Sequence, residues 1–158
     1  MSEQSRVTLH VNGRDHQVDA SASDILLDTL RDRLDLHSVR GACGIGICGT
    51  CTVLVDGSPI SSCLSLTALN EGRSIVTSEG LGDGDLDPVQ EAFISNDAFQ
   101  CSYCIPAMVL TVRAYLDRAE SPTVEEAMET LAGNLCRCGS YPQVIEALGD
   151  LIERREPR

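Results

Sequence analysis

Eight cysteines in two groups of four constrain this chain more than any other feature of its sequence. The first group follows the pattern C-x4-C-x2-C with a fourth cysteine after eleven further residues, and the second pairs a C-x2-C with a distant C-x-C. Thiolates at such spacing are typical ligands of metal centres. The first group comprises Cys43, Cys48, Cys51 and Cys63, and the second comprises Cys101, Cys104, Cys136 and Cys138.

Composition limits the compartment and the partners. The chain has 158 residues, of which 42% are hydrophobic, without an apolar run long enough to cross a membrane. Its polar start, Met1 to Arg6, differs from a signal peptide, so we expect a cytoplasmic protein without membrane insertion. Thiols of a reducing compartment do not persist as disulfides, which favours metal ligation. A net charge of -12 argues against nucleic acid as a partner.

The first half of the chain carries strand signals. Residues 6–11 alternate apolar and polar side chains, Asn12-Gly13 suits a tight primed turn, and residues 15–18 offer a returning strand. Further strands are expected at residues 52–55 and 74–77. The pattern predicts a hairpin and a small sheet.

A helix is expected directly after the hairpin. Ser23 is positioned to cap it, and its apolar positions recur at helical spacing at Leu26, Leu27, Leu30 and Leu34. Short strands around one helix, with the first cysteines in a loop, indicate a compact α+β half.

A polar, glycine-rich segment at residues 80–87 predicts a linker, which divides the chain into domains 1–82 and 83–158. Its alternating aspartates resemble the start of a calcium loop, but Pro88 stands in place of the required glycine. Four helices are expected beyond it. Their signals are Asp87-Pro88, the apolar run from Ile105 to Leu116, the capping sequence at Thr123, and Pro142.

The first cysteine group has the ligand spacing of a plant-type [2Fe-2S] ferredoxin. Glycines between the cysteines let the backbone curl around a cluster and direct N–H groups at sulfur. Zinc is the alternative, although zinc sites usually combine two C-x2-C knuckles. Gly44, Gly46 and Gly49 also match a dinucleotide-binding fingerprint, which we reject because no clear strand precedes it.

The second group does not distinguish iron from zinc by spacing alone. A Rieske centre needs two histidine ligands, and His10, His16 and His37 all lie outside both groups. No nucleophile and base occur together in a catalytic pattern, so we expect the chain alone to perform no substrate chemistry.

The motifs that hold these cysteines resemble the iron-sulfur subunit of the molybdenum hydroxylases, the family of xanthine dehydrogenase, aldehyde oxidoreductase and aerobic carbon monoxide dehydrogenase. The similarity runs from about residue 7 to residue 151. It rests on CGIGICGTCTV from Cys43, on QCSYCIPAM from Gln100, and on GNLCRCGSY from Gly133.

This resemblance implies a ferredoxin-like β-grasp domain followed by a four-helix domain. All eight cysteines would bind two [2Fe-2S] clusters, and Gln100 and Cys138 would contact the pterin. The chain would relay electrons from molybdopterin, in its cytosine dinucleotide form, to FAD. A large subunit would bind molybdopterin, while a medium subunit would bind FAD, in a heterotrimer or a dimer of heterotrimers.

Departures from the family pattern are local. Ser102 and Ala107 replace commoner glycines, Ile105 replaces a commoner threonine, and Gly139-Ser140 replaces a frequent Thr-Gly. Arg137 lies between two ligands, where it would offset cluster charge, bond a cofactor phosphate, or form an ordinary solvated or interfacial salt bridge.

Two other functions remain open from the residues. A free two-cluster ferredoxin would purify alone and reduce soluble acceptors. A zinc-held scaffold would be colourless and without redox activity, whereas an iron-sulfur protein is coloured and bleaches on reduction.

Overall fold

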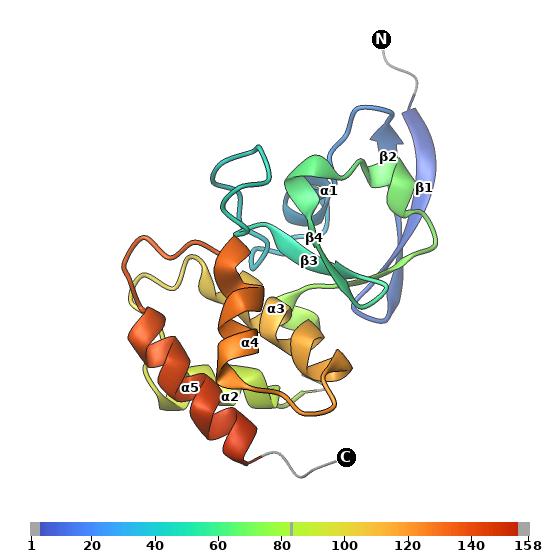
Figure 1. Ribbon diagram of the computed structural model, residues 1–158. Helices are drawn as coiled ribbons and strands as arrows, with labels where there is room; N and C mark the ends of the chain where they lie inside the picture. Colours follow the sequence, from blue (N-terminus) through green and yellow to red (C-terminus); the bar gives the residue numbers. More distant parts are fainter. Residues whose placement is uncertain (1–3, 83, 155–158) are drawn as a thin grey trace.

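The molecule divides into a strand-rich half and a helical half (Figure 1). The structure is a computed structural model that describes residues 4–82 and 84–154. Its strands are β1 Gln4–Val11, β2 Arg14–Ser21, β3 Thr52–Val55, β4 Ser58–Ser61 and β5 Ser74–Val76. Its helices are α1 Leu26–Asp28, α2 Pro88–Ser95, α3 Ile105–Arg118, α4 Val124–Thr130 and α5 Tyr141–Glu153. Shorter helical turns are η1 Thr29–Arg33, η2 Ser62–Leu64, η3 Thr67–Asn70, η4 Ser78–Gly80 and η5 Leu131–Gly133.

The strands form one mixed sheet in the order β2-β1-β5-β3-β4. The predicted hairpin is confirmed, since β1 and β2 pair antiparallel around a turn in which Asn12 and Gly13 both have positive φ. Strand β5 lies parallel to β1 and antiparallel to β3. This α+β sheet confirms the ferredoxin-like fold that the sequence predicted.

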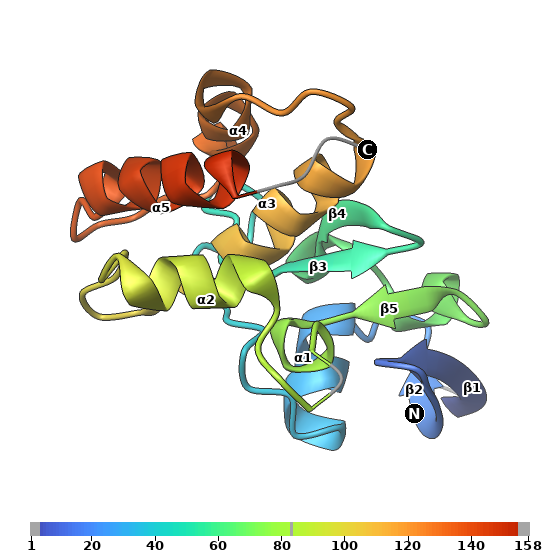
Figure 2. The ribbon, with the colours of Figure 1, turned by 90° about the horizontal axis from the view of Figure 1, so that it is seen from below.

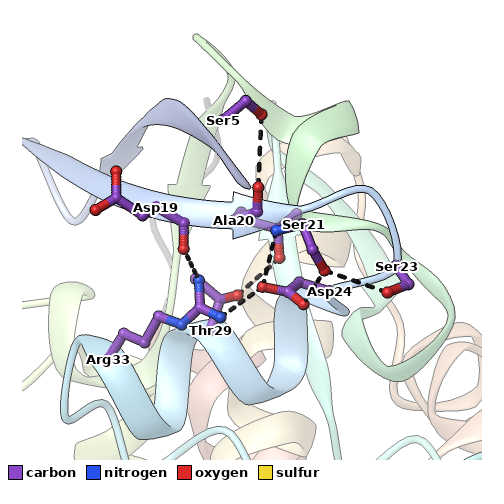
Figure 3. A network of polar contacts seen from close by, with 9 residues as sticks. Ser5, Asp19, Ala20, Ser21, Ser23, Asp24, Thr29 and Arg33 are labelled. Atoms are coloured by element: carbon purple, nitrogen blue, oxygen red, sulfur yellow. Dashed lines mark hydrogen bonds and ion pairs between the residues drawn. The ribbon is translucent and has the colours of Figure 1, made fainter. Parts of the chain in front are cut away.

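The helix after the hairpin differs from the prediction at its start. The expected cap by Ser23 is wrong, because α1 begins after Ile25 without a side-chain cap and its path continues as the π-helical turn η1. Asp24 takes the local hydrogen bonds instead. Its carboxylate accepts from the backbone and hydroxyl of Ser21 at 3.1 and 2.5 Å and pairs with Arg33, as Figure 3 shows.

The apolar positions of this helix are confirmed as core. Leu26, Leu27 and Leu30 are buried against the sheet, and Leu34 packs at the edge of the same cluster. The helix therefore covers one face of the sheet and leads the chain toward the first cysteine loop.

Within residues 84–154, four α-helices make up the second half, as predicted (Figure 2). Asp87 caps α2 through a capping box with Gln90, and the Thr123 hydroxyl accepts a hydrogen bond from the backbone of Glu126 to cap α4. Helix α5 begins at Tyr141, one residue before the proline that signalled it. The linker boundary predicted after residue 82 adjoins residue 83, which lies outside the described residues.

Helix α3 joins the two halves. Most of its apolar side chains, including Met108 and Leu116, pack in the helical core. Leu110 and Ala114 instead form a small buried cluster with Leu54 of β3. The helical half is therefore seated against the sheet by apolar contact, near the loops that carry the cysteines. Within residues 4–82 and 84–154, every helix is too short or too polar to cross a bilayer.

Candidate metal centres

The first four cysteines converge around the loop at residues 41–51. The Cys43 sulfur accepts hydrogen bonds from the backbone N–H groups of Ile47 and Cys48, both at 3.4 Å. Positive φ angles at Gly44, Gly46 and Gly49 produce this inward curl, as the glycine pattern predicted. Cys63 reaches the same place from η2. The loop thus surrounds sulfur with backbone donors.

The pKa values of this group follow from those contacts. Hydrogen bonds from the backbone N–H of Ile45, and from the backbone and thiol of Cys48, lower the pKa of Cys43 to about 6. Burial, followed by the contact with Cys51, raises the pKa of Cys63 to about 11. Thiolate is the metal-binding form of cysteine, so the lowered pKa of Cys43 favours metal binding at the loop.

The second four cysteines come from two loops of the helical half. Cys101 and Cys104 precede α3, and Cys136 and Cys138 lie between η5 and α5. Cys104 is buried, whereas Cys101 and Cys138 are exposed. The backbone N–H of Ser140 donates to the Cys136 sulfur at 3.5 Å. Cys104 directly precedes α3, so the start of that helix positions it.

Backbone donors also act on the second group. The N–H of Tyr103, followed by the thiol of Cys138, lowers the pKa of Cys101. Burial and the contact with Cys136 raise the pKa of Cys104 to about 12. Burial opposes the shift at Cys136, but hydrogen bonds from Ser140 and from the Cys104 thiol lower its pKa.

The sulfurs of each group lie in pairs. The thiol contacts join Cys43 to Cys48 and Cys51 to Cys63 in the first group, and Cys101 to Cys138 and Cys104 to Cys136 in the second. Across the described ranges 4–82 and 84–154, no three His, Cys, Asp or Glu side chains gather closely enough to share one ion. Two pairs of thiolates match a [2Fe-2S] cluster, in which each iron takes two protein ligands. The residues present therefore fit the cluster.

The two cysteine groups meet at the boundary between the halves. The backbone N–H of Leu135 donates to the carbonyl of Cys48 at 2.9 Å, so the residue next to one group bonds directly to a member of the other. The residues next to this pair also bond to each other: the buried side-chain amide of Asn134 donates to the carbonyl of Gly49 at 2.9 Å. The same side chain accepts from the Thr111 hydroxyl at 3.0 Å.

A second set of contacts ties the other ends of the two loops. Arg40 donates to the carbonyl of Ser102 and lies over the Tyr103 ring, 5.2 Å from its centroid. The Tyr103 hydroxyl donates to the carbonyl of Gly41 at 2.7 Å. Nearly all these boundary contacts lie within three residues of a cysteine of one group or the other.

A cavity of about 390 Å³ lies between the two groups. Its walls include Cys48 from the first group and three cysteines of the second, together with Tyr103 and Arg137. Cys101, Cys104 and Cys136 are those three. Sequence reasoning found every cysteine but missed the contacts of Arg40 and Asn134, because a side chain that bonds to a loop distant in sequence carries no spacing signal.

Family models match both halves. A 2Fe-2S iron-sulfur cluster binding domain matches residues 9–76, and a [2Fe-2S] binding domain matches residues 77–149. The fold and these two matches define a two-domain protein that binds two [2Fe-2S] clusters and serves electron transfer.

Relatives place that protein class in one family. The chain is 42% identical to the nicotine 6-hydroxylase small subunit of Paenarthrobacter nicotinovorans, over 94% of this chain and 90% of the relative. It is 38% identical to the nicotinate dehydrogenase small FeS subunit of Eubacterium barkeri, over 94% and 95%. Quinoline 2-oxidoreductase from Pseudomonas putida 86 superposes with a TM-score of 0.91 at 36% identity, covering 99% of this chain and 100% of that one. The chain belongs to the iron-sulfur subunits of the molybdenum hydroxylases and is part of an oxidoreductase complex.

Proposed function

We propose that the chain relays electrons from a molybdopterin centre to FAD, each held by a partner subunit, during hydroxylation of a substrate. Cys43, Cys48, Cys51 and Cys63 would bind the first cluster, and Cys101, Cys104, Cys136 and Cys138 the second. A [2Fe-2S] cluster supplies one-electron chemistry at low potential. The division into domains 1–82 and 83–158 belongs to the same proposal.

The contact between Cys48 and Leu135 carries this proposal. It is a backbone hydrogen bond across the domain boundary, and on its helical side only the Leu135 backbone separates it from Cys136. Asn134 holds the adjacent carbonyl, so the boundary is fixed where the two cysteine groups approach each other. Such fixed spacing supports transfer between two redox centres within one chain.

The exposed cysteines of the second group support the proposal that this face contacts the molybdenum subunit. Cys101 and Cys138 are exposed, and the Gln100 amide donates to the Cys138 carbonyl at 3.4 Å. Gln100 and Cys138 would contact the pterin from this face. The cytosine dinucleotide form remains part of the proposal on family grounds.

Apolar side chains around the first loop favour a bound subunit over a free ferredoxin. Ile45, Ile47, Leu64 and Leu69 are each more than 60% exposed. Leu64 lies over Gly46, where an added Cβ would be 2.4 Å from its Cδ1 atom, so Leu64 and the loop share one surface. Exposed apolar surface of this kind is typical of protein interfaces, here with the FAD subunit.

Purification of the native complex tests the proposal. We expect a large molybdenum-containing chain and a medium flavin-containing chain to accompany this one, as a heterotrimer or a dimer of heterotrimers. The small chain should be red-brown and should bleach with dithionite. A chain that purifies alone and reduces soluble acceptors would support the free ferredoxin, and a colourless zinc protein would exclude both.

A further inference from the structure

The Ser140 hydroxyl is buried beside the second cysteine group without a hydrogen-bond partner of its own. Ser140 is only 1% exposed, and its Oγ has no partner of good geometry among the residues that the structure describes. A buried hydroxyl in that condition destabilises the fold, because it has lost its hydrogen bonds to water. Native folds seldom retain such a group without a purpose.

Helix capping does not account for this serine. Ser140 directly precedes α5, the position where a serine side chain usually accepts from the first turn, yet it makes no such bond. The hydroxyl is therefore not required to start the helix.

The turn that contains Ser140 faces the Cys136 sulfur. Gly139 adopts a φ of +82° and turns the chain back, and the backbone N–H of Ser140 then donates to Cys136 Sγ at 3.5 Å. The buried Ser140 hydroxyl belongs to the same turn and has no partner among the residues that the structure describes. The Cys136 sulfur is thus an acceptor in direct contact with the backbone of the residue that carries the unpaired hydroxyl.

We propose that Ser140 raises the reduction potential of the second cluster by donating a hydrogen bond to a sulfur atom at Cys136. This rests on the proposed function, in which Cys136 binds that cluster. Reduction adds one electron, moves no proton and increases the negative charge on sulfur. A hydrogen bond to sulfur therefore stabilises the reduced form more than the oxidised form.

The first cysteine group offers a matched comparison. The Thr50 hydroxyl lies 3.2 Å from the Cys48 sulfur. Thr50→Val removes that hydroxyl and keeps the side-chain shape, so it should lower the potential of the first cluster alone. Ser140→Ala and Ser140→Gly should lower the potential of the second cluster alone.

Redox titration of the purified complex, followed by electron paramagnetic resonance, tests the proposal. At a fixed potential we expect each Ser140 variant to reduce the ratio of reduced to oxidised second cluster by about three- to tenfold. A tenfold change corresponds to 59 mV for one electron. Agreement between Ala and Gly separates the hydroxyl from the packing of Cβ.

The outcomes are distinct. Two clusters whose potentials do not change in either Ser140 variant overturn the role of Ser140 and leave the proposed function intact. A shift of the first cluster instead of the second also overturns it. A complex without two clusters contradicts the proposed function itself, before any variant is made.

Discussion

Gly49→Ala should separate the two halves of the protein more than any other glycine change in the first loop. Gly49 has a φ of +67°, and a Cβ built there would be 2.2 Å from the Gly133 carbonyl oxygen and 2.8 Å from Asn134 Nδ2. Real Cβ atoms are essentially never closer than 3.0 Å to such neighbours. Because the nearest atom is backbone, the boundary itself must move.

Gly44→Ala is the control that isolates the backbone cost. Gly44 has the same φ of +67° and also follows a cysteine, but nothing lies within 4 Å of its added Cβ. A left-handed residue with a side chain costs about 1–2 kcal/mol in both variants. Gly49→Ala should lose a further 2–3 kcal/mol, roughly, since two boundary hydrogen bonds weaken at about 1 kcal/mol each and overpacking adds strain.

Thermal unfolding of the iron-loaded protein, followed by far-ultraviolet circular dichroism, measures this difference. For a chain of this size the extra loss lowers the midpoint by about 5–10 °C relative to Gly44→Ala. Equal midpoints for the two variants would show that the Gly49 contact does not hold the halves together.

The remaining predictions concern other parts of the same architecture. Ser102 has a φ of +61°, so Ser102→Gly should relieve strain and raise stability by about 1 kcal/mol in a denaturant titration; a lower midpoint would contradict this. Cys48→Ser should abolish one of two electron paramagnetic resonance signals, and retention of both would refute its assignment as a ligand. Hydrogen bonds from Ser21, then Arg33, hold the pKa of Asp24 below its ordinary 3.8, so its carboxylate contributes stability above that pH and loses it as pH falls through the folded pKa. Asp24→Asn should therefore lower the thermal unfolding midpoint, relative to the unchanged protein, by the same amount at every pH from 5 to 8. A difference in midpoint that varies over that range would contradict this.

Local signals in the sequence predicted most elements of the fold. The turn at Asn12-Gly13 and the caps at Asp87 and Thr123 depend on residues close in sequence, and each was confirmed. Strand β4 was missed because it is a four-residue edge strand that contains Pro59, which interrupts the usual pattern. The cap at Ser23 failed because Ile25 pairs with Leu66 in an isolated bridge and the Leu26 N–H donates to the Ser65 carbonyl, so the helix begins only after Ile25.

The arrangement of the candidate site could be predicted only in part from the sequence. Spacing identified the cysteines and favoured iron for the first group, but left the second group undecided between iron and zinc. The contact of Asn134 with Gly49 joins residues 85 positions apart, and Arg40 reaches Ser102 over 62 positions. No local pattern encodes such contacts, because they depend on how the two halves pack together. The pairing of sulfurs likewise emerges only once distant loops are in place.

Metal and sulfide analysis of anaerobically isolated protein tests the central claim most directly. Two [2Fe-2S] clusters on eight cysteines require about four irons and four acid-labile sulfides per chain, with two distinguishable signals after reduction. Stoichiometric zinc, or only about two irons with all eight cysteines intact, would contradict the account.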